Sequence, residues 1–253
     1  MSRPGAGSLL LGLSVLLSGC AGVVQEKEGV AIEGRDGTFQ VRKGRPGVVI
    51  GAPHGTSDKD TDRIAIDLAE RTGFSLVVAT GFTHVDAAGQ RFNVNRPTMS
   101  VSGAPPATEI QSAEARRVYE AYRRHVAEAA QGPLALYVEI HGNGNAASAG
   151  RVEVATVGLG RDDAWRLKTL FELIRDSHVE DPAAPRLDVW VEAIDPVRYT
   201  ASASKQAGML AVAPRALHIE LPRAARTTYR ETYTTILAAF LSESATFLVP
   251  RER

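Results

Sequence analysis

Short apolar segments alternate with amphipathic helical segments along most of this chain, and this alternation limits the possible folds more than any other feature. Strand-like apolar runs lie at 48–50, 75–79, 134–140, 187–191 and 217–221. Apolar residues at helical spacing lie within 64–69, 115–129, 165–174 and 229–240. Strands that alternate with helices pair mostly in parallel. The pattern therefore predicts an α/β fold, a single domain whose mostly parallel or mixed central sheet has helices on both faces.

Composition excludes several classes of site. The 253 residues include one cysteine, which excludes an intramolecular disulfide, a Cys-rich zinc ribbon and an iron–sulfur cluster. Lys plus Arg and Asp plus Glu both number 29, so no net charge attracts nucleic acid. With 44% hydrophobic residues, the chain suits one globular core.

The first residues have the pattern of a secretory signal. Arg3 precedes an apolar run at 9–17, which is too short to span a bilayer because a spanning helix needs about 20 residues. The run closes on Leu17-Ser18-Gly19-Cys20. This ending resembles the lipobox of bacterial lipoproteins, which implies cleavage before Cys20 and acylation of its thiol. The alternative is an ordinary signal peptide followed by a free thiol.

Three parts of the chain are expected on this basis. They are a lipoprotein signal peptide at 1–19, the lipidated Cys20 with a tether at 20–46, and an α/β domain at 47–253. Acyl chains hold a soluble domain at a membrane without a spanning helix. Ala21 is not the aspartate that favours inner-membrane retention in enteric lipoproteins. We therefore expect a lipid anchor in the bacterial cell envelope, at the outer membrane and facing the periplasm.

Two histidines follow strand-like segments. His54 comes just after 48–50, among glycines, and His141 closes the segment 134–140. Ligands of open α/β sheets bind at the carboxyl ends of strands, so both imidazoles are candidate metal ligands. Two histidines and one carboxylate leave a fourth tetrahedral position for water, which is the pattern of catalytic zinc. Glu139 points to the same side of its strand as His141 and could orient an imidazole.

Glu220 lies inside the apolar segment 217–221, where an unpaired carboxylate is costly to bury. Near a metal it could take a proton from bound water and pass it to a leaving amine. The alternative is a buried ion pair with Arg223 or Arg226. His218 shares the strand face of Glu220, and we interpret it as a core histidine.

The loop 91–97 carries two guanidinium groups and two amides. Arginine binds a carboxylate through two parallel hydrogen bonds, so Arg96, helped by Asn95, is a candidate substrate-binding residue. A solvated surface role fits Arg91 at least as well.

The order of these motifs resembles the zinc carboxypeptidases and their relatives, the N-formylglutamate amidohydrolases. It runs from His54 through Asn95-Arg96 and His141 to Glu220 in Ile219-Glu220-Leu221. The resemblance implies the fold and the zinc-dependent chemistry of these enzymes, with Glu220 as general base. It also implies that Asn95 and Arg96 hold a substrate carboxylate or the oxyanion that develops during catalysis.

One position departs from the carboxypeptidase pattern. The third residue after His54 is Ser57 where those enzymes have glutamate, and Asp58 follows one place later. As the nearest acid, Asp58 takes the ligand role, with Asp60 and Asp62 as fallbacks. Either fallback residue could equally cap the helix that follows, and for Asp62 we favour the cap. The expected metal site is one Zn²⁺ held by His54, Asp58 and His141.

The expected function is zinc-dependent hydrolysis of an amide bond in a carboxylate-bearing substrate such as an N-acyl amino acid. Carboxypeptidase-type hydrolysis of peptides or cell-wall peptides is the alternative within the enzymes. A non-catalytic lipoprotein that binds a metal or another ligand is the alternative of another class. The expected partners are a small-molecule or peptide substrate and, through the lipid, a membrane, but not nucleic acid.

Overall fold

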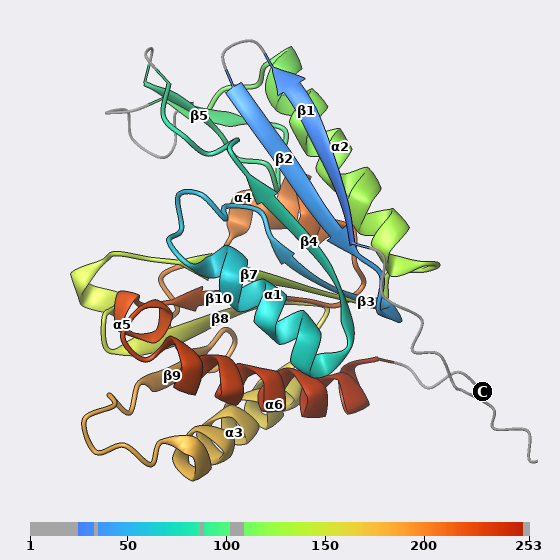
Figure 1. Cartoon of the computed structure of the whole chain (residues 1–253). Coiled ribbons are helices and arrows are strands. Elements are labelled where there is room, and N and C mark those ends of the chain that lie inside the picture. Colours follow the sequence, from blue (N-terminus) through green and yellow to red (C-terminus); the bar gives the residue numbers. More distant parts are fainter. Residues whose placement is uncertain (1–24, 33–34, 87–88, 102–108, 250–253) are drawn as a thin grey trace, which may run out of the picture.

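The computed structural model describes residues 25–32, 35–86, 89–101 and 109–249 (Figure 1). The predicted signal peptide and Cys20 lie outside the described residues. The described residues form an eight-stranded sheet of β1 (Gln25–Ile32), β2 (Arg35–Arg42), β3 (Arg45–Ala52), β4 (Phe74–Thr80), β7 (Leu136–Gly142), β8 (Arg151–Val157), β9 (Asp188–Val191) and β10 (Ala216–Leu221). A separate two-stranded sheet pairs β5 (Gln90–Phe92) with β6 (Met99–Val101).

The large sheet is mixed, with strand order β1-β2-β4-β3-β7-β10-β8-β9. Its centre is parallel, because β3 pairs in parallel with both β4 and β7, and β7 pairs in parallel with β10. The antiparallel pairs lie on either side of this centre. On one side β1 pairs with β2 and β2 with β4, and on the other β10 pairs with β8. The carboxyl ends of β3, β7 and β10 therefore meet at one edge of the sheet.

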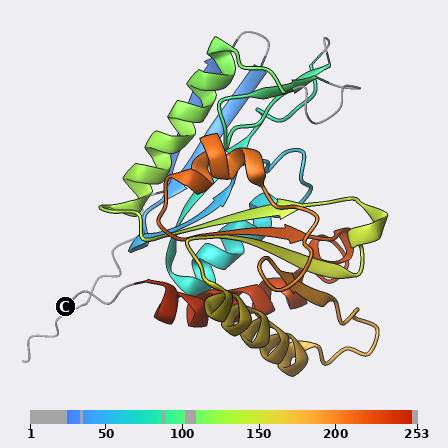
Figure 2. The ribbon, with the colours of Figure 1, turned by 180° about the vertical axis from the view of Figure 1, so that it is seen from behind.

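Helices cover both faces of this sheet, as predicted (Figures 1 and 2). One face packs against α1 (Thr61–Thr72), α3 (Arg161–His178) and α6 (Arg230–Leu248). The other packs against α2 (Ala113–Ala130) and the segment of α4 (Ser202–Ala207) and the short 3-10 turn η3 (Met209–Ala211). A second such turn, η2 (Ala146–Ser148), precedes β8, and the one-turn helix α5 (Arg223–Arg226) follows β10. Within the described residues, no helix is both long and apolar enough to cross a bilayer.

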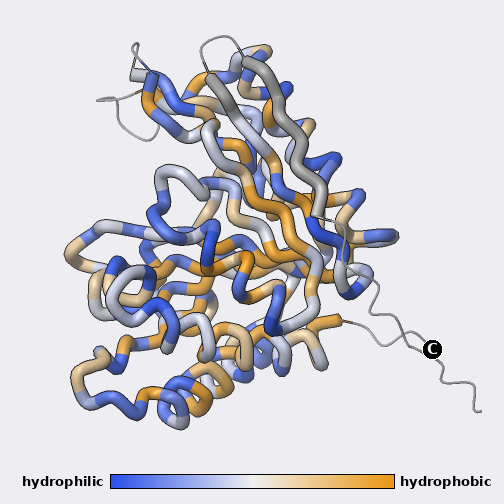
Figure 3. The backbone as a smooth tube through the Cα atoms, viewed as in Figure 1, coloured by the Kyte–Doolittle hydropathy of each residue, from blue (hydrophilic) through white to orange (hydrophobic). Residues whose placement is uncertain are grey.

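The central strands are buried on both faces, and their alternation decides which face receives polar side chains. Figure 3 shows the hydrophobic residues concentrated along these strands. In β7, Val138 and Ile140 join the core under α1, α3 and α6. The intervening Tyr137, Glu139 and His141 lie on the opposite face, that of α2. The acid and the imidazole are therefore placed together on the face away from the larger core.

The predicted start of the domain at Gly47 is too late. Within the expected tether at 20–46, β1 and β2 form a hairpin, and β2 pairs antiparallel with β4. Phe39 of β2 is fully buried and stacks on Phe82, with ring centroids 4.6 Å apart. Residues 39–42, within that expected tether, form the carboxyl half of β2. The domain thus begins at least as early as Gln25.

Candidate metal and active site

Three adjacent strands bring the predicted site residues together. His54 follows β3, and His141 lies at the end of β7, which pairs with β3. Glu220 of β10 is the register partner of His141. His54 and Glu220 are 166 positions apart in the chain. They meet because the parallel strands at the centre of the sheet end at the same edge.

His54, Asp58 and His141 form a group with metal-ligand geometry. Oδ2 of Asp58 lies 3.4 Å from Nδ1 of His54 and 3.3 Å from Nδ1 of His141. One donor atom from each of the three residues lies within 4.8 Å of the others. Nε2 of His54 hydrogen-bonds to the carbonyl of Asn93 at 3.0 Å, which leaves Nδ1 free to bind a cation. Two imidazole nitrogens and a carboxylate oxygen match the donor set of a catalytic zinc site.

Asp58 reaches this group because the chain makes a helical turn after His54. The Asp58 N–H donates to the carbonyl of His54 at 2.9 Å, so the two side chains lie one turn apart on the same side. The N–H of Gly142 donates to Oδ2 of Asp58 at 3.1 Å and fixes the carboxylate against β7. Asp60, one of the two fallback ligands, instead lies 3.6 Å from Arg63. The turn accounts for an acid at the fourth position after His54 rather than the third.

Glu139 occupies the centre of a second group, which lies behind the first. This fully buried carboxylate faces Nε2 of His141 and Nδ1 of His218, both at 3.2 Å from its Oε2. Asn95 donates Nδ2 to the same oxygen at 3.2 Å. On its other side, His218 places Nε2 at 3.2 Å from Oε1 of Glu220. His218 therefore lies between Glu139 and Glu220, the predicted general base, and contacts both carboxylates.

Glu139, His141 and His218 also have metal-ligand spacing, and the two groups share His141. Glu139 has no solvent exposure, and Asn95 and the two imidazoles already occupy its oxygens. His141 and His218 of this second group also line a cleft of about 460 Å³, but its central acid does not. All three members of the first group, His54, Asp58 and His141, line that cleft. The first group therefore fits a catalytic metal, and Glu139 fits the carboxylate that orients a ligand imidazole.

Contacts within the two groups shift the pKa values of their members. Burial alone would raise the pKa of Asp58, but hydrogen bonds and charges from His141 and His54 hold it well below its usual range. The pKa of Glu139 is lowered in the same way, because contacts with His141 and His218 outweigh burial. Burial opposes protonation of His141, yet its bonds to Asp58 and Glu139 raise its pKa to about 10. Both carboxylates are thus ionised at neutral pH and hold a proton on His141. A metal ion that binds Nδ1 of His141 has to displace that proton.

Glu220 has one occupied and one free carboxylate oxygen. It is 7% exposed and borders the cleft. Oε1 contacts His218, whereas Oε2 has no hydrogen-bond partner among the described residues. The alternative ion pair with Arg223 or Arg226 does not form among these residues, because Arg226 donates to main-chain carbonyls instead. A free oxygen beside a metal group is what a general base requires.

Arg96 and Asn95 line the cleft, but their side chains are already engaged. Nε and Nη2 of Arg96 donate to the two oxygens of Glu109, the former at 2.8 Å. Nη1 of Arg96 donates to Oδ1 of Asn95 at 3.2 Å, and Asn95 in turn donates to Glu139. A guanidinium has five N–H groups, so Nη1 and Nη2 each keep one for a ligand. Arg91 also lines the cleft, with Nε donating to Ser100.

The cleft contains residues that the sequence did not single out, among them Asn143, Tyr199, Ser202 and Ser204. Asn143 is 5% exposed, and neither its side-chain oxygen nor its nitrogen has a partner among the described residues. It lies two positions after His141, so the strand alternation that placed the histidine could have indicated it. The other residues reach the cleft from the 199–204 segment, which carries no motif.

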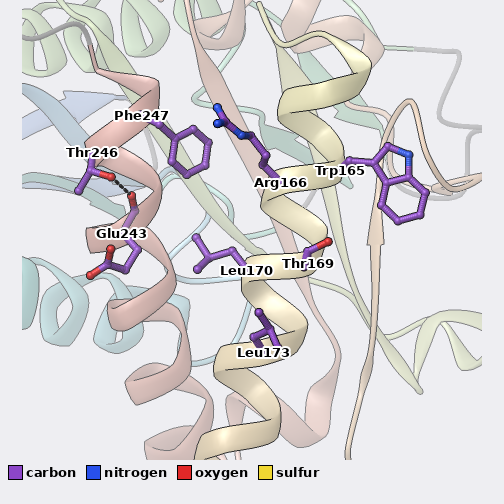
Figure 4. Close-up of a pocket in the computed structure, with 8 residues that line it drawn as sticks. All are labelled: Trp165, Arg166, Thr169, Leu170, Leu173, Glu243, Thr246 and Phe247. Atoms are coloured by element: carbon purple, nitrogen blue, oxygen red, sulfur yellow. Dashed lines mark hydrogen bonds between the residues drawn. The ribbon is translucent and has the colours of Figure 1, made fainter.

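A second hollow lies between α3 and α6, away from these groups. Figure 4 shows Leu170, Leu173 and Phe247 lining it, with Arg166 and Glu243 as its charged residues. Its lining contributes to neither metal-ligand group found among the described residues. The chemistry-bearing side chains are therefore concentrated in the cleft at the strand ends.

Fold and site together define an α/β protein with a metal-ligand group at the carboxyl ends of its parallel strands. No protein-family model and no curated protein sequence matches the chain. Among solved structures, bacteriophage poly-gamma-glutamate hydrolase is similar, with a TM-score of 0.50 and 14% identity, over 84% of this chain and 89% of that one. This similarity confirms the predicted α/β fold.

Two bacterial metallo-carboxypeptidases are also similar. The enzyme from Burkholderia cenocepacia has a TM-score of 0.49 and 14% identity, over 88% of this chain and 66% of that one. The enzyme from Pseudomonas aeruginosa, in complex with (2-guanidinoethylmercapto)succinic acid, has a TM-score of 0.45 and 17% identity, over 88% and 65%.

Proposed function

We propose that this protein is a zinc-dependent hydrolase that cleaves an amide bond in a carboxylate-bearing substrate. The observation that carries the proposal is the meeting of His54 Nδ1, His141 Nδ1 and Asp58 Oδ2, with Glu220 on the neighbouring strand. Zinc is the metal that this mixture of imidazole and carboxylate donors suits best when the site is to be catalytic. The fold shared with the phage hydrolase agrees with this assignment.

His54, Asp58 and His141 would hold the ion. A zinc ion held there would lower the pKa of a coordinated water to about 7 and so would supply a nucleophile at neutral pH. Glu139 keeps the His141 imidazole in position by accepting from its Nε2 at 3.2 Å. The protein thus contributes two histidines, one acid and a buried acid that orients one of the histidines.

Glu220 is the proton carrier in this proposal. Its Oε2 is free to accept a proton from the attacking water, while His218 holds Oε1. The same oxygen then delivers the proton to the departing nitrogen, so the carboxylate returns to its ionised state. The unused N–H groups of Arg96 face the cleft and are suited to a substrate carboxylate or to the developing oxyanion.

An N-acyl amino acid is the substrate class that the motifs favour, and a peptide is the alternative. Arg91 and Arg96 on one side of the cleft support a carboxylate-bearing substrate in either case. The name of the similar phage enzyme gives poly-gamma-glutamate as its substrate, which is both an amide polymer and rich in carboxylates. A panel of formylated, acetylated and γ-glutamyl compounds beside cell-wall peptides separates these substrates.

Metal analysis and activity assays test the proposal. The purified chain should contain about one zinc, and His54→Ala and His141→Ala should lose it, whereas His218→Ala should retain it because His218 belongs to the second group. Glu220→Gln should keep its zinc and lose hydrolysis by about 10²- to 10⁴-fold. His178→Ala, at the end of α3, is the matched histidine control. A chain without zinc would overturn the metal assignment.

Full hydrolytic activity in Glu220→Gln would overturn the role of Glu220 as proton carrier while leaving the metal site standing. A wild-type chain that binds zinc but hydrolyses none of these substrates would instead be a lipoprotein that binds a metal or another ligand without catalysis. The presence of an unpartnered Oε2 on Glu220 favours the enzyme over this second class.

We further propose that the protein is anchored in the bacterial envelope through a lipid on Cys20, at the outer membrane and facing the periplasm. The support is the sequence Leu17-Ser18-Gly19-Cys20 after a short apolar run. Labelling of the growing cells with a fatty acid should mark the wild-type chain and not Cys20→Ser. Equal labelling of the two would refute the anchor.

A further inference from the structure

Arg226 is a buried cation that none of the proposed catalytic steps uses. It ends the one-turn helix α5, which follows β10 directly, and it is 6% exposed. Its guanidinium lies behind the cleft and has no carboxylate in ion-pair contact among the described residues. A buried charge of this kind is costly unless its donors are satisfied, so its partners indicate what it stabilises.

The three partners of Arg226 are main-chain carbonyls from three different segments of the chain. Nη1 donates to the carbonyl of Lys59, the residue after Asp58. Nη2 donates to the carbonyl of Asn143 at 3.1 Å, and Nε donates to the carbonyl of Leu221, the residue after Glu220, at 3.1 Å. One planar group therefore bonds the backbone next to a metal ligand, next to the end of β7 and next to the general base.

The backbone around this group is built to admit it. A Cβ atom at Gly142 would lie 2.4 Å from Cζ and Nε of Arg226, so position 142 admits no side chain while the guanidinium keeps its place. Gly142 is also the residue whose N–H holds Asp58. The N–H of Asn143 donates to the carbonyl of Leu221 at 3.0 Å and closes the same cluster from the other side.

We propose that Arg226 is a positioning residue that ties the loops of β3, β7 and β10 together and thereby sets the distance between the metal ligands and Glu220. The proposal rests on the proposed function, because it assigns Asp58 and His141 to the metal and Glu220 to proton transfer. A lysine cannot replace the arginine, since an ammonium is a point charge without the planar fork that reaches three carbonyls.

The test compares the metal-binding behaviour of variants of the full chain. In Arg226→Met, the zinc Kd measured against a chromophoric chelator should rise by 10- to 100-fold, as is common when a group that supports metal ligands is lost. Arg226→Lys should show a similar defect, because it keeps the charge and loses the fork. The visible absorption of the cobalt-loaded chain should change in both variants, which reports altered ligand geometry. On any substrate that the wild type hydrolyses, kcat should fall more than KM changes.

Arg223→Met is the matched control, because Arg223 lies in the same one-turn helix and is exposed. It should keep the zinc Kd and cobalt spectrum of the wild type. If Arg226→Met does not fold, Gly142→Ala provides the second lesion, because it displaces the guanidinium without removing it, and it should give the same cobalt spectral change.

Unchanged zinc affinity and cobalt spectrum in folded Arg226→Lys and Gly142→Ala would overturn the positioning role and leave the proposed function intact. A wild-type chain that binds no zinc would overturn the proposed function, and the positioning role with it. A purely structural role for Arg226 would lower the thermal stability of the metal-free chain while the zinc Kd and cobalt spectrum of the folded chain stayed the same.

Discussion

Two glutamates show how partners decide the role of a residue. Glu139 and Glu220 each lie two positions from a histidine, on the same face of neighbouring parallel strands. Glu139 is surrounded by His141, His218 and Asn95, so its oxygens are occupied and it acts as a fixed acceptor. Glu220 borders the cleft, and its buried Oε2 has no hydrogen-bond partner among the described residues. Identical side chains in similar strand positions thus separate into an orienting acid and a proton acceptor.

The ion pair between Arg96 and Glu109 should stabilise the fold in a pH-dependent way. Burial alone would raise the pKa of Glu109, but hydrogen bonds from Arg96 lower it from its usual value. A carboxyl whose pKa is lowered by folding adds stability above its unfolded pKa of about 4.3, and this stability is lost as pH falls through the folded value. Glu109→Gln should therefore cost about 1–2 kcal/mol of unfolding free energy at pH 7, and the difference should shrink below about pH 4.

Urea unfolding at several pH values measures this difference. Glu120→Gln is the control, because Glu120 pairs with Arg123 on the exposed side of α2 and should change stability by no more than about 0.5 kcal/mol. A loss in Glu109→Gln that stays constant down to pH 3 would contradict the ion-pair explanation.

The sequence predicted the site residues that stand at strand ends and missed how they are engaged. His54, His141 and Glu220 follow or end apolar runs, and parallel strand ends meet by rule, so their convergence is predictable. The partner of Arg96 is Glu109, 13 residues away and outside any motif, so pairing across the loop could not be predicted. A single helical turn after His54 decides which acid joins the metal-ligand group. The local sequence pattern does not determine such a turn.

At the scale of elements, the strands that follow a strong apolar pattern were predicted, and those that mix apolar with polar or charged residues were not. β3, β4, β7, β9 and β10 lie where apolar runs indicated them. In β2, the buried Phe39 and Val41 alternate with charged and polar residues. Its local sequence pattern therefore resembles that of a polar linker. In β8, Glu153 separates Val152 and Val154 and is buried through bonds to Arg151 and Ser148. Tertiary pairing, rather than local propensity, makes these segments strands.

β3 approaches α2 and β7 so closely that one position requires glycine. A Cβ at Gly51 would lie 2.5 Å from the hydroxyl oxygens of Tyr122 and Tyr137, which hydrogen-bond each other at 3.0 Å. Both rings are fully buried, so neither can move without disturbing the core. Gly51→Ala should therefore lower the free energy of unfolding by about 1–3 kcal/mol, the usual cost of overpacking.

Chemical denaturation of the metal-free chain measures the effect of Gly51→Ala without a contribution from metal binding. Gly150→Ala is the matched control, since a Cβ there meets no atom within 4 Å. It should be neutral or slightly stabilising, by up to about 1 kcal/mol. Equal stability of the two variants would show that β3 can move away from the tyrosines.

At the scale of the whole molecule, the chain enters the sheet on the side away from the cleft. Gln25, the first residue of β1, pairs with Arg42, which pairs with Leu76 near the start of β4. His54 and His141 instead lie at the carboxyl ends of β3 and β7. In Figure 1 the arrowheads of β7 and β10 point away from the side on which β1 begins. The described chain therefore begins, at Gln25, on the side of the sheet opposite the cleft.

Metal binding should stabilise the entire fold, because the proposed ligands come from segments that meet only in the native chain. A ligand present at 100 times its Kd adds about 2.7 kcal/mol to the free energy of unfolding. For a domain of this size, 1 kcal/mol corresponds to about 2–4 °C, so saturating zinc should raise Tm by about 5–10 °C. Differential scanning fluorimetry with and without a chelator measures the shift. His141→Ala should show none, whereas Glu220→Gln should keep it in full. A zinc-dependent shift that survives in His141→Ala would place the ion somewhere other than between β3 and β7.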